Sequence, residues 1–169
     1  MIILVMGVAG SGKTTIGQAL GTVYRLPFLD ADQFHPPANI AKMKAGSPLN
    51  DADRQPWLER LNQELTRREA KGPGAVLACS ALKASYREIL LHGLDTPTAR
   101  GPYTVFLKGS EELIDARMKA RKDHFMPPTL LASQFATLEA PEASAKVFVI
   151  DVGPTPEQII EDVKKRIGV

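Results

Sequence analysis

Ile2-Ile3-Leu4-Val5-Met6-Gly7-Val8-Ala9-Gly10-Ser11-Gly12-Lys13-Thr14 is the stretch that decides the fold of this 169-residue chain. Its first five residues are apolar and predict a buried strand, and residues 7–14 match the phosphate-binding loop G-x-x-x-x-G-K-[ST]. The glycines let backbone N–H groups surround a phosphate chain, Lys13 can reach the transferring phosphoryl group, and the Thr14 hydroxyl can bind Mg²⁺. Because a helical pattern follows directly, a glycine-rich turn without a ligand is the weaker interpretation. The stretch predicts a nucleoside triphosphate site.

Length and composition indicate one domain, residues 1–169. The chain is 44% hydrophobic, enough for one buried core and too short for two ordinary domains. With 21 basic and 19 acidic residues and no basic block, nothing indicates a nucleic-acid or membrane partner. Cys79 is the only cysteine, no signal peptide precedes the first strand, and no apolar run approaches the ~20 residues that cross a bilayer. We therefore expect a cytoplasmic protein without disulfides that acts on small molecules.

Strand-like and helix-like segments alternate along the chain, as in a parallel sheet with crossover helices. Short apolar runs predict strands covered on both faces at residues 2–6, 27–30, 75–79, 103–107 and 146–150. Amphipathic patterns predict helices at about 13–24, 57–70, 82–91, 111–121 and 156–167. The predicted fold is therefore α/β and three-layered, with a five-stranded parallel sheet flanked by helices.

In such sheets the ligand lies beyond the carboxyl ends of the strands. The segments that follow the predicted strands are residues 7–14, 30–35, 80–87, 108–109 and 151–156. We expect all five to line one crevice.

Asp30-Ala31-Asp32 places two carboxylates at the end of the second predicted strand, beside the phosphate-binding loop. While the chain is extended, alternate side chains point the same way. One carboxylate can help to hold Mg²⁺ and the other can accept a proton from an attacking hydroxyl. A solvated Asp-rich turn would carry the same residues. We favour Asp32 as the base and Asp30 as the metal-binding residue.

A long polar stretch without strand periodicity, residues 33–58, follows the aspartates and is predicted to be an acceptor-binding element. His35, Lys42 and Arg54 supply donors suited to a hydroxylated anion. For His35 a loop histidine satisfied by backbone fits the spacing at least as well, and so does a surface pair or a helix cap for Asp53-Arg54.

Two further groups of basic residues follow the third and fourth predicted strands. Ser80 can cap a helix on which Lys83 and Arg87, four residues apart, could hold a carboxylate. Arg117 and Arg121 are also four apart, and the Pro127-Pro128 interruption predicts a mobile lid over about 117–135 that closes on the nucleotide. Solvated basic helix faces are the alternative for both groups.

Taken together, these motifs resemble the small gluconate kinases, relatives of shikimate kinase and adenylate kinase. The resemblance covers essentially the whole chain. Besides the phosphate loop it rests on residues 30–36, Lys42-Met43, residues 46–49, 51–58 and 79–83, Tyr86-Arg87, residues 121–125 and Ser133-Gln134-Phe135. It implies transfer of the ATP γ-phosphate to the 6-hydroxyl of D-gluconate, giving 6-phosphogluconate, with Mg²⁺ and as a homodimer.

With the resemblance, the candidate site takes its full form. The candidate residues are Lys13, Asp32 and Arg121 for catalysis; Gly7, Val8, Ala9, Gly10, Ser11, Gly12, Lys13, Thr14, Thr15, Arg117 and Pro154 for ATP; Asp32, His35, Lys42, Arg54, Lys83, Arg87 and His124 for the acceptor; and Thr14 and Asp30 for Mg²⁺.

The sequence departs from the family pattern at two positions. Ala31 stands where glycine is frequent, which adds one methyl group, and Asp123 stands where glycine is common, which adds a carboxylate mildly repulsive to phosphates.

A kinase of shikimate or of a nucleoside monophosphate is the second interpretation, and the 35–58 stretch weighs against it. A nucleotide switch is disfavoured because the chain has neither the Asp-x-x-Gly nor the Asn-Lys-x-Asp pattern.

Overall fold

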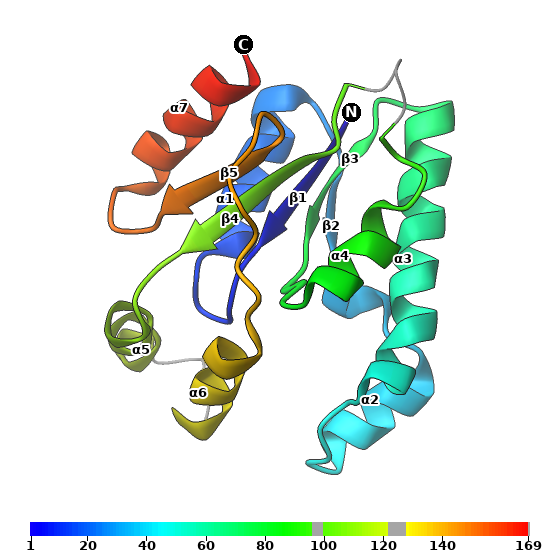
Figure 1. Ribbon diagram of the computed structural model, residues 1–169, viewed down its shortest axis with the longest axis vertical. Coiled ribbons are helices and arrows are strands. Elements are labelled where there is room, and N and C mark those ends of the chain that lie inside the picture. Colours follow the sequence, from blue (N-terminus) through cyan, green and yellow to red (C-terminus); the bar gives the residue numbers. More distant parts are fainter. Residues whose placement is uncertain (96–99, 122–127, 169) are drawn as a thin grey trace.

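Five parallel strands form one sheet between helical layers in the computed structural model, which describes residues 1–95, 100–121 and 128–168 (Figure 1). The strands are β1 Ile2–Met6, β2 Phe28–Asp30, β3 Ala75–Ala78, β4 Tyr103–Lys108 and β5 Val147–Asp151, in the order β2-β3-β1-β4-β5. The helices are α1 Lys13–Tyr24, α2 Pro37–Lys44, α3 Asp51–Lys71, α4 Ala84–Leu91, α5 Glu111–Ala120, α6 Pro128–Thr137 and α7 Pro156–Ile167, with a 3₁₀ helix at Ala31–Phe34. Each predicted strand lies within one residue of its observed bounds, so the predicted fold class is confirmed.

The central strand β1 sends alternate side chains into two cores, which explains its unbroken apolar sequence. On one face Leu4 packs with Leu61 of α3. On the other, Ile3 packs with Leu20 of α1 and Val163 of α7. Figure 1 shows α3 and α4 on one side of the sheet and α1 and α7 on the other.

The polar stretch 33–58 is largely helical, which the sequence did not predict. It contains α2 and the first residues of α3, which begins at Asp51 and not near residue 57. A capping box starts α3: Asn50 accepts from the Asp53 N–H at 2.8 Å, and Asp53 accepts from the Asn50 N–H at 2.9 Å. The start of α3 could not be predicted because its first turn is polar and because Pro56, a residue that is unusual within helices, lies inside it.

Helix α4 also differs from the prediction, because Ser80 does not cap it. The helix begins at Ala84, with Lys83 at the N-cap position. The carboxylate of Glu139 accepts the Ala84 N–H at 2.6 Å and takes the place of a local cap. Lys83 therefore precedes the helix, and it does not share a helical face with Arg87.

The carboxyl ends of β1, β3 and β2 lie level at one end of the sheet. Val5 of β1 pairs with Ala78 of β3, which in turn pairs with Asp30 of β2. Just beyond this end the Gly7 N–H donates to the Ser80 carbonyl at 3.4 Å. The loops that follow β1, β2 and β3 therefore meet, as the sequence predicted for its crevice.

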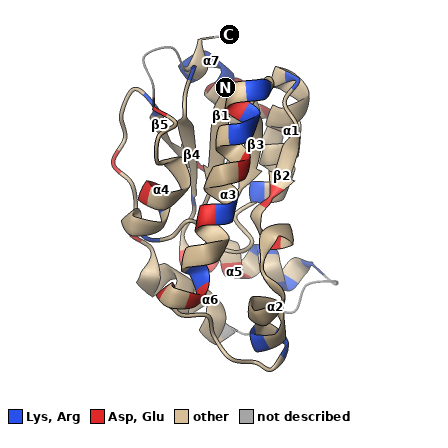
Figure 2. Cartoon of the chain, turned by 90° about the vertical axis from the view of Figure 1, so that its right-hand side faces the viewer, with Lys and Arg blue, Asp and Glu red and all other residues tan. Residues whose placement is uncertain are grey.

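Basic and acidic residues are interspersed on the face shown in Figure 2, including along α3. This mixing agrees with the absence of a basic block in the sequence. Among the helices of residues 1–95, 100–121 and 128–168, none is both long and apolar enough to cross a membrane.

Candidate functional site

The phosphate-binding loop joins β1 to α1 in a conformation that only glycine adopts easily at two positions. Gly10 has φ 76° and Gly12 has φ 97°. Within the described part of the chain, no side chain caps α1 at Gly12, so the first-turn N–H groups face outward without a local acceptor. A side chain at Gly10 would collide with Met118 of α5, whose Cγ would lie 2.6 Å from the added Cβ. The loop has the geometry of an anion site, and α5 packs on its outer side.

The side chain of Lys13 connects this loop with the two aspartates, whose charges act on it. Its ammonium group donates to the Val8 carbonyl at 2.9 Å. Burial lowers the pKa of Lys13, while Cys79, Asp32 and Asp30 act to raise it. The two carboxylates are thus close enough to act on the Lys13 charge, as the sequence predicted.

Cys79 lies beside Lys13 and is buried, as predicted for a structural residue. Burial raises the pKa of its thiol to about 12. The thiol is therefore protonated at neutral pH and is no nucleophile.

Asp30 and Asp32 lie on either side of a turn. The sequence predicted an extended chain between them, and this prediction is wrong. Asp30 ends β2, and its Oδ1 accepts the Asp32 N–H at 3.0 Å at the start of the 3₁₀ helix. Burial and the neighbouring Asp30 raise the pKa of Asp32, against the lowering effects of His35 and Lys13. A carboxylate with a raised pKa is a better proton acceptor near neutral pH.

Thr14 and Asp30 offer a hydroxyl and a carboxylate oxygen, the ligand types that Mg²⁺ prefers. Thr14 is exposed in the first turn of α1, and Asp30 ends β2 at the same end of the sheet. No group of three or more His, Cys, Asp or Glu side chains within the described residues is arranged as a metal site. Mg²⁺ in kinases takes one or two protein ligands and otherwise phosphate oxygens and water.

His35 is held by an aromatic stack and one hydrogen bond. Its ring stacks on Trp57 of α3, with centroids 4.2 Å apart, and the Asn39 side-chain amide lies 3.2 Å from His35 Nδ1. Burial lowers the pKa of His35, Asp32 raises it and Arg54 lowers it. At neutral pH the imidazole is therefore mostly neutral. Because the Asn39 amide nitrogen can only donate, Nδ1 accepts and the ring proton lies on Nε2.

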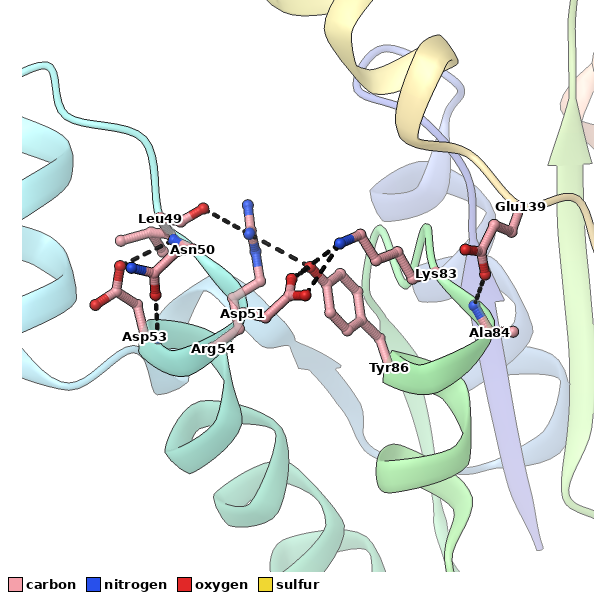
Figure 3. Close-up of polar contacts among 9 residues, drawn as sticks. All are labelled: Leu49, Asn50, Asp51, Asp53, Arg54, Lys83, Ala84, Tyr86 and Glu139. Atoms are coloured by element: carbon pink, nitrogen blue, oxygen red, sulfur yellow. Dashed lines mark hydrogen bonds and ion pairs between the residues drawn. The ribbon is translucent and has the colours of Figure 1, made fainter.

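A polar cluster joins the start of α3 to the start of α4 (Figure 3). Tyr86 donates its hydroxyl to Asp51, and Lys83 donates to both Asp51 oxygens at 3.0 and 3.1 Å. Arg54 lies over the Tyr86 ring, 5.6 Å from its centroid, and donates to the Leu49 carbonyl at 2.6 Å. The cluster fixes Arg54 near His35, on whose pKa it acts.

Lys42 and Arg87, both predicted to bind the acceptor, have partners inside the chain. Lys42 forms an ion pair of 2.6 Å with Asp53, the capping residue of α3. Arg87 donates to the carbonyl groups of Ala81 and Leu82 at 2.9 and 3.2 Å and of Glu139 at 2.9 Å. These contacts give both cations a part in the scaffold; their role in acceptor binding stays a prediction.

The remaining candidates lie around the edge of the described structure. Arg117 is half-buried on α5, and Arg121 is the exposed C-cap of the same helix. Pro154 is exposed in the turn before α7, where Asp151 Oδ1 accepts the Gly153 N–H at 2.8 Å. His124 and Asp123 lie outside the described residues. From residue 128 onward the predicted lid segment is helical, because α6 begins there; its movement stays a prediction.

Sequence reasoning assigned no role to Trp57, Tyr86 or Gln134, although each belongs to a motif that carries the family resemblance. Trp57 supports His35, and Tyr86 supports Arg54. Gln134 contacts the phosphate loop itself.

Comparisons with known proteins identify the family of this chain. Residues 9–167 match the family model described as shikimate kinase. The chain is 45% identical over 176 aligned residues to a gluconokinase of Arabidopsis thaliana, covering 99% of this chain and 92% of that protein. A gluconokinase structure from Sinorhizobium meliloti has a TM-score of 0.84 and 40% identity, covering 98% of this chain and 90% of the other. A sugar kinase structure from Janibacter has a TM-score of 0.86 and 43% identity, covering 98% and 93%.

Proposed function

This chain belongs to the gluconokinase family within the wider shikimate kinase group, and on that premise we propose that it phosphorylates D-gluconate at the 6-hydroxyl with ATP, giving 6-phosphogluconate and ADP. One observation carries the proposal. In a chain similar to gluconokinases over nearly its whole length, Asp32 is close enough to both Lys13 of the phosphate loop and His35 for their charges to lower its pKa. Asp32 is therefore the residue where donor and acceptor meet.

On the donor side, residues 7–15 hold the phosphates of ATP through backbone N–H groups other than those of Gly7, Ala9 and Ser11, which donate within the chain. Lys13 neutralises charge that develops on the transferring group. Thr14 and Asp30 would hold Mg²⁺, which would supply further positive charge to the phosphates of ATP. Lys13 is well suited to this task. Because burial already penalises its charge, an anion that approaches its ammonium group relieves that penalty.

On the acceptor side, Asp32 takes the proton of the 6-hydroxyl while that oxygen forms a bond to the γ-phosphorus. The bond between the γ-phosphorus and the bridging oxygen breaks, and its electron pair leaves with ADP. The neutral His35 donates from Nε2 to a sugar hydroxyl, and Arg54 pairs with the carboxylate. Lys83, which pairs with Asp51 at 3.0 Å in the same polar cluster as Arg54, is the second cation proposed for the acceptor.

Further parts of the proposal concern ATP coverage and assembly. The predicted lid, 117–135, covers ATP with its α6 part already packed against the phosphate loop, so that any closure moves the residues that precede α6. Arg117 and Pro154 then lie near the nucleotide and Arg121 on the transferring phosphoryl group. The protein acts in the cytoplasm as a homodimer. Sedimentation of the purified chain and fractionation of its cells test these last two points.

The decisive experiment is a coupled assay of ADP release with gluconate, other sugar acids, shikimate and nucleoside monophosphates as acceptors. We expect gluconate to give the highest kcat/KM. A higher kcat/KM with shikimate or with a nucleoside monophosphate would contradict the proposed acceptor while leaving the kinase reaction standing. ADP release equal with and without every acceptor would contradict the reaction itself.

A further inference from the structure

One backbone amide of the phosphate loop is bound by a side chain from a distant helix. The Ala9 N–H donates to Oε1 of Gln134 at 2.7 Å, although the two residues are 125 positions apart. Gln134 is half-buried on α6, one helical turn after Leu131. Nothing in the phosphate-loop pattern itself calls for this contact.

The hydrogen bond belongs to a wider contact between α6 and the loop. Leu131 of α6 is buried with Val8 of the loop, Leu82 and Ile114 of α5 in a small cluster separate from the two main cores. Met118 of α5 packs against the same cluster and lies against Gly10. The apolar contacts hold α6 at the loop, and the Gln134 bond fixes one peptide orientation within it.

The far end of α6 is anchored on the acceptor side. Glu139, two residues after the helix, accepts the Ala84 N–H at 2.6 Å and donates its own N–H to the Leu82 carbonyl at 2.8 Å. Arg87 donates to the Glu139 carbonyl at 2.9 Å. Figure 3 shows Glu139 and Ala84 beside Lys83 and Tyr86 of the polar cluster. Helix α6 therefore links the phosphate loop to the start of α4.

We propose that Gln134 is a positioning residue for phosphoryl transfer: its Oε1 fixes the Ala9 amide and so holds the phosphate loop in the conformation that binds the nucleotide. This inference rests on the proposed kinase function and deepens it. Preorganised loop amides stabilise the phosphates without rearranging. When the Gln134–Ala9 hydrogen bond is lost, the loop must be ordered on binding, and this lowers the net free energy of nucleotide binding. Loss of the bond should lower the affinity for the nucleotide and not that for the acceptor, because Ala9 belongs to the phosphate loop and Gln134 is not part of the polar cluster.

The test compares Gln134→Met with Ser133→Ala. Methionine keeps the length and helix propensity of glutamine and removes the acceptor atom, while Ser133 is the exposed neighbour on the same helix. Net hydrogen-bond energies of about 0.5–1.5 kcal/mol correspond to roughly 2- to 12-fold. We expect Gln134→Met to raise KM for ATP by about that factor with KM for gluconate unchanged, and Ser133→Ala to match the wild type.

Calorimetric titration of ADP keeps this test independent of the acceptor, because it needs no turnover. The same weakening is expected there, and it stands even if gluconate is not the substrate. Lower kcat with both KM values and ADP affinity unchanged would indicate a smaller active fraction and overturn the proposal, as would tighter nucleotide binding. If Gln134→Met does not fold, Gln134→Asn shortens the side chain by one methylene group and should show the same shift. Faster hydrogen exchange of the Ala9 amide in either variant is expected, and unchanged exchange would contradict the anchor.

Discussion

Trp57 donates its indole N–H to the Ala31 carbonyl at 2.8 Å, which ties α3 to the peptide between the two site aspartates. Ala31 is buried, so its carbonyl depends on this donor. The same indole ring stacks on His35. One side chain of α3 therefore sets the position of both the candidate base and the neighbouring imidazole.

Trp57→Phe should separate these two functions, since phenylalanine keeps a ring against His35 and removes the donor. A buried carbonyl left without a partner costs about 1–3 kcal/mol of unfolding free energy, which urea denaturation measures. Tyr24→Phe is the control, because the buried Tyr24 hydroxyl has no partner among the described residues. A stability loss as large in the control, or none in Trp57→Phe, would contradict the assignment.

Lys13→Ala should remove most of the turnover and leave the fold intact. A charge that acts mainly on the transition state is worth about 3 kcal/mol or more, while burial of the Lys13 ammonium gives little native-state benefit. Steady-state kinetics and circular dichroism measure the two effects. Lys164→Ala on α7, where Lys164 pairs with Glu161, is the charge-matched control. A folded variant that keeps most of its kcat would exclude Lys13 from catalysis.

Asp32→Asn should lower kcat by roughly 10²-fold or more, because the amide cannot accept the proton. The wild-type pH profile carries a second test. Activity falls as pH drops through the pKa of Asp32, which burial and Asp30 raise above its ordinary value. Asp30→Asn removes the charge that raises this pKa, so the acid limb should move to lower pH even if the rate also falls. Asp162→Asn on α7 should leave the limb in place; a limb unmoved by Asp30→Asn would contradict the coupling.

These assignments show which parts of the molecule the sequence could predict. The strands were predictable because burial on both faces leaves unbroken apolar runs, and the phosphate loop because its chemistry demands glycine, lysine and threonine at fixed spacing. The meeting of Asp30 and Asp32 with Lys13 followed from the topology of a parallel sheet.

Features that depend on distant partners were not predictable. The cap of α4 comes from Glu139, 55 residues downstream of Ala84, and Arg87 is bound by carbonyl groups from two segments. Helix α2 has a short polar sequence after Pro36, so neither periodicity nor a side-chain cap announces it. The Gln134 bond to Ala9 has no local signal at all.

Arg54→Ala should weaken gluconate far more than ATP. We expect a rise in KM for gluconate that corresponds to a loss of about 1–3 kcal/mol of binding free energy, because a closed site leaves the acceptor carboxylate without its donor. Arg60→Ala is the control, since Arg60 is an exposed residue of the same helix that lies over Phe34. Equal weakening of the binding of both ligands would show that Arg54 has a structural role, through its hydrogen bonds to the Leu49 carbonyl and the Tyr86 hydroxyl.

Arg121→Ala should lower kcat and kcat/KM together with little change in gluconate affinity, if the lid brings this residue onto the transferring phosphoryl group. Arg121 is exposed at the C-cap of α5, so its guanidinium is free of the core and its loss should not affect stability. Lys119→Ala is the control, because Lys119 is exposed on the same helix and pairs with Asp115. Should Arg117→Ala be crippled while Arg121→Ala behaves like the wild type, the two arginines exchange roles. Wild-type kinetics in both variants would remove the lid from the mechanism and leave these arginines as a solvated helix face.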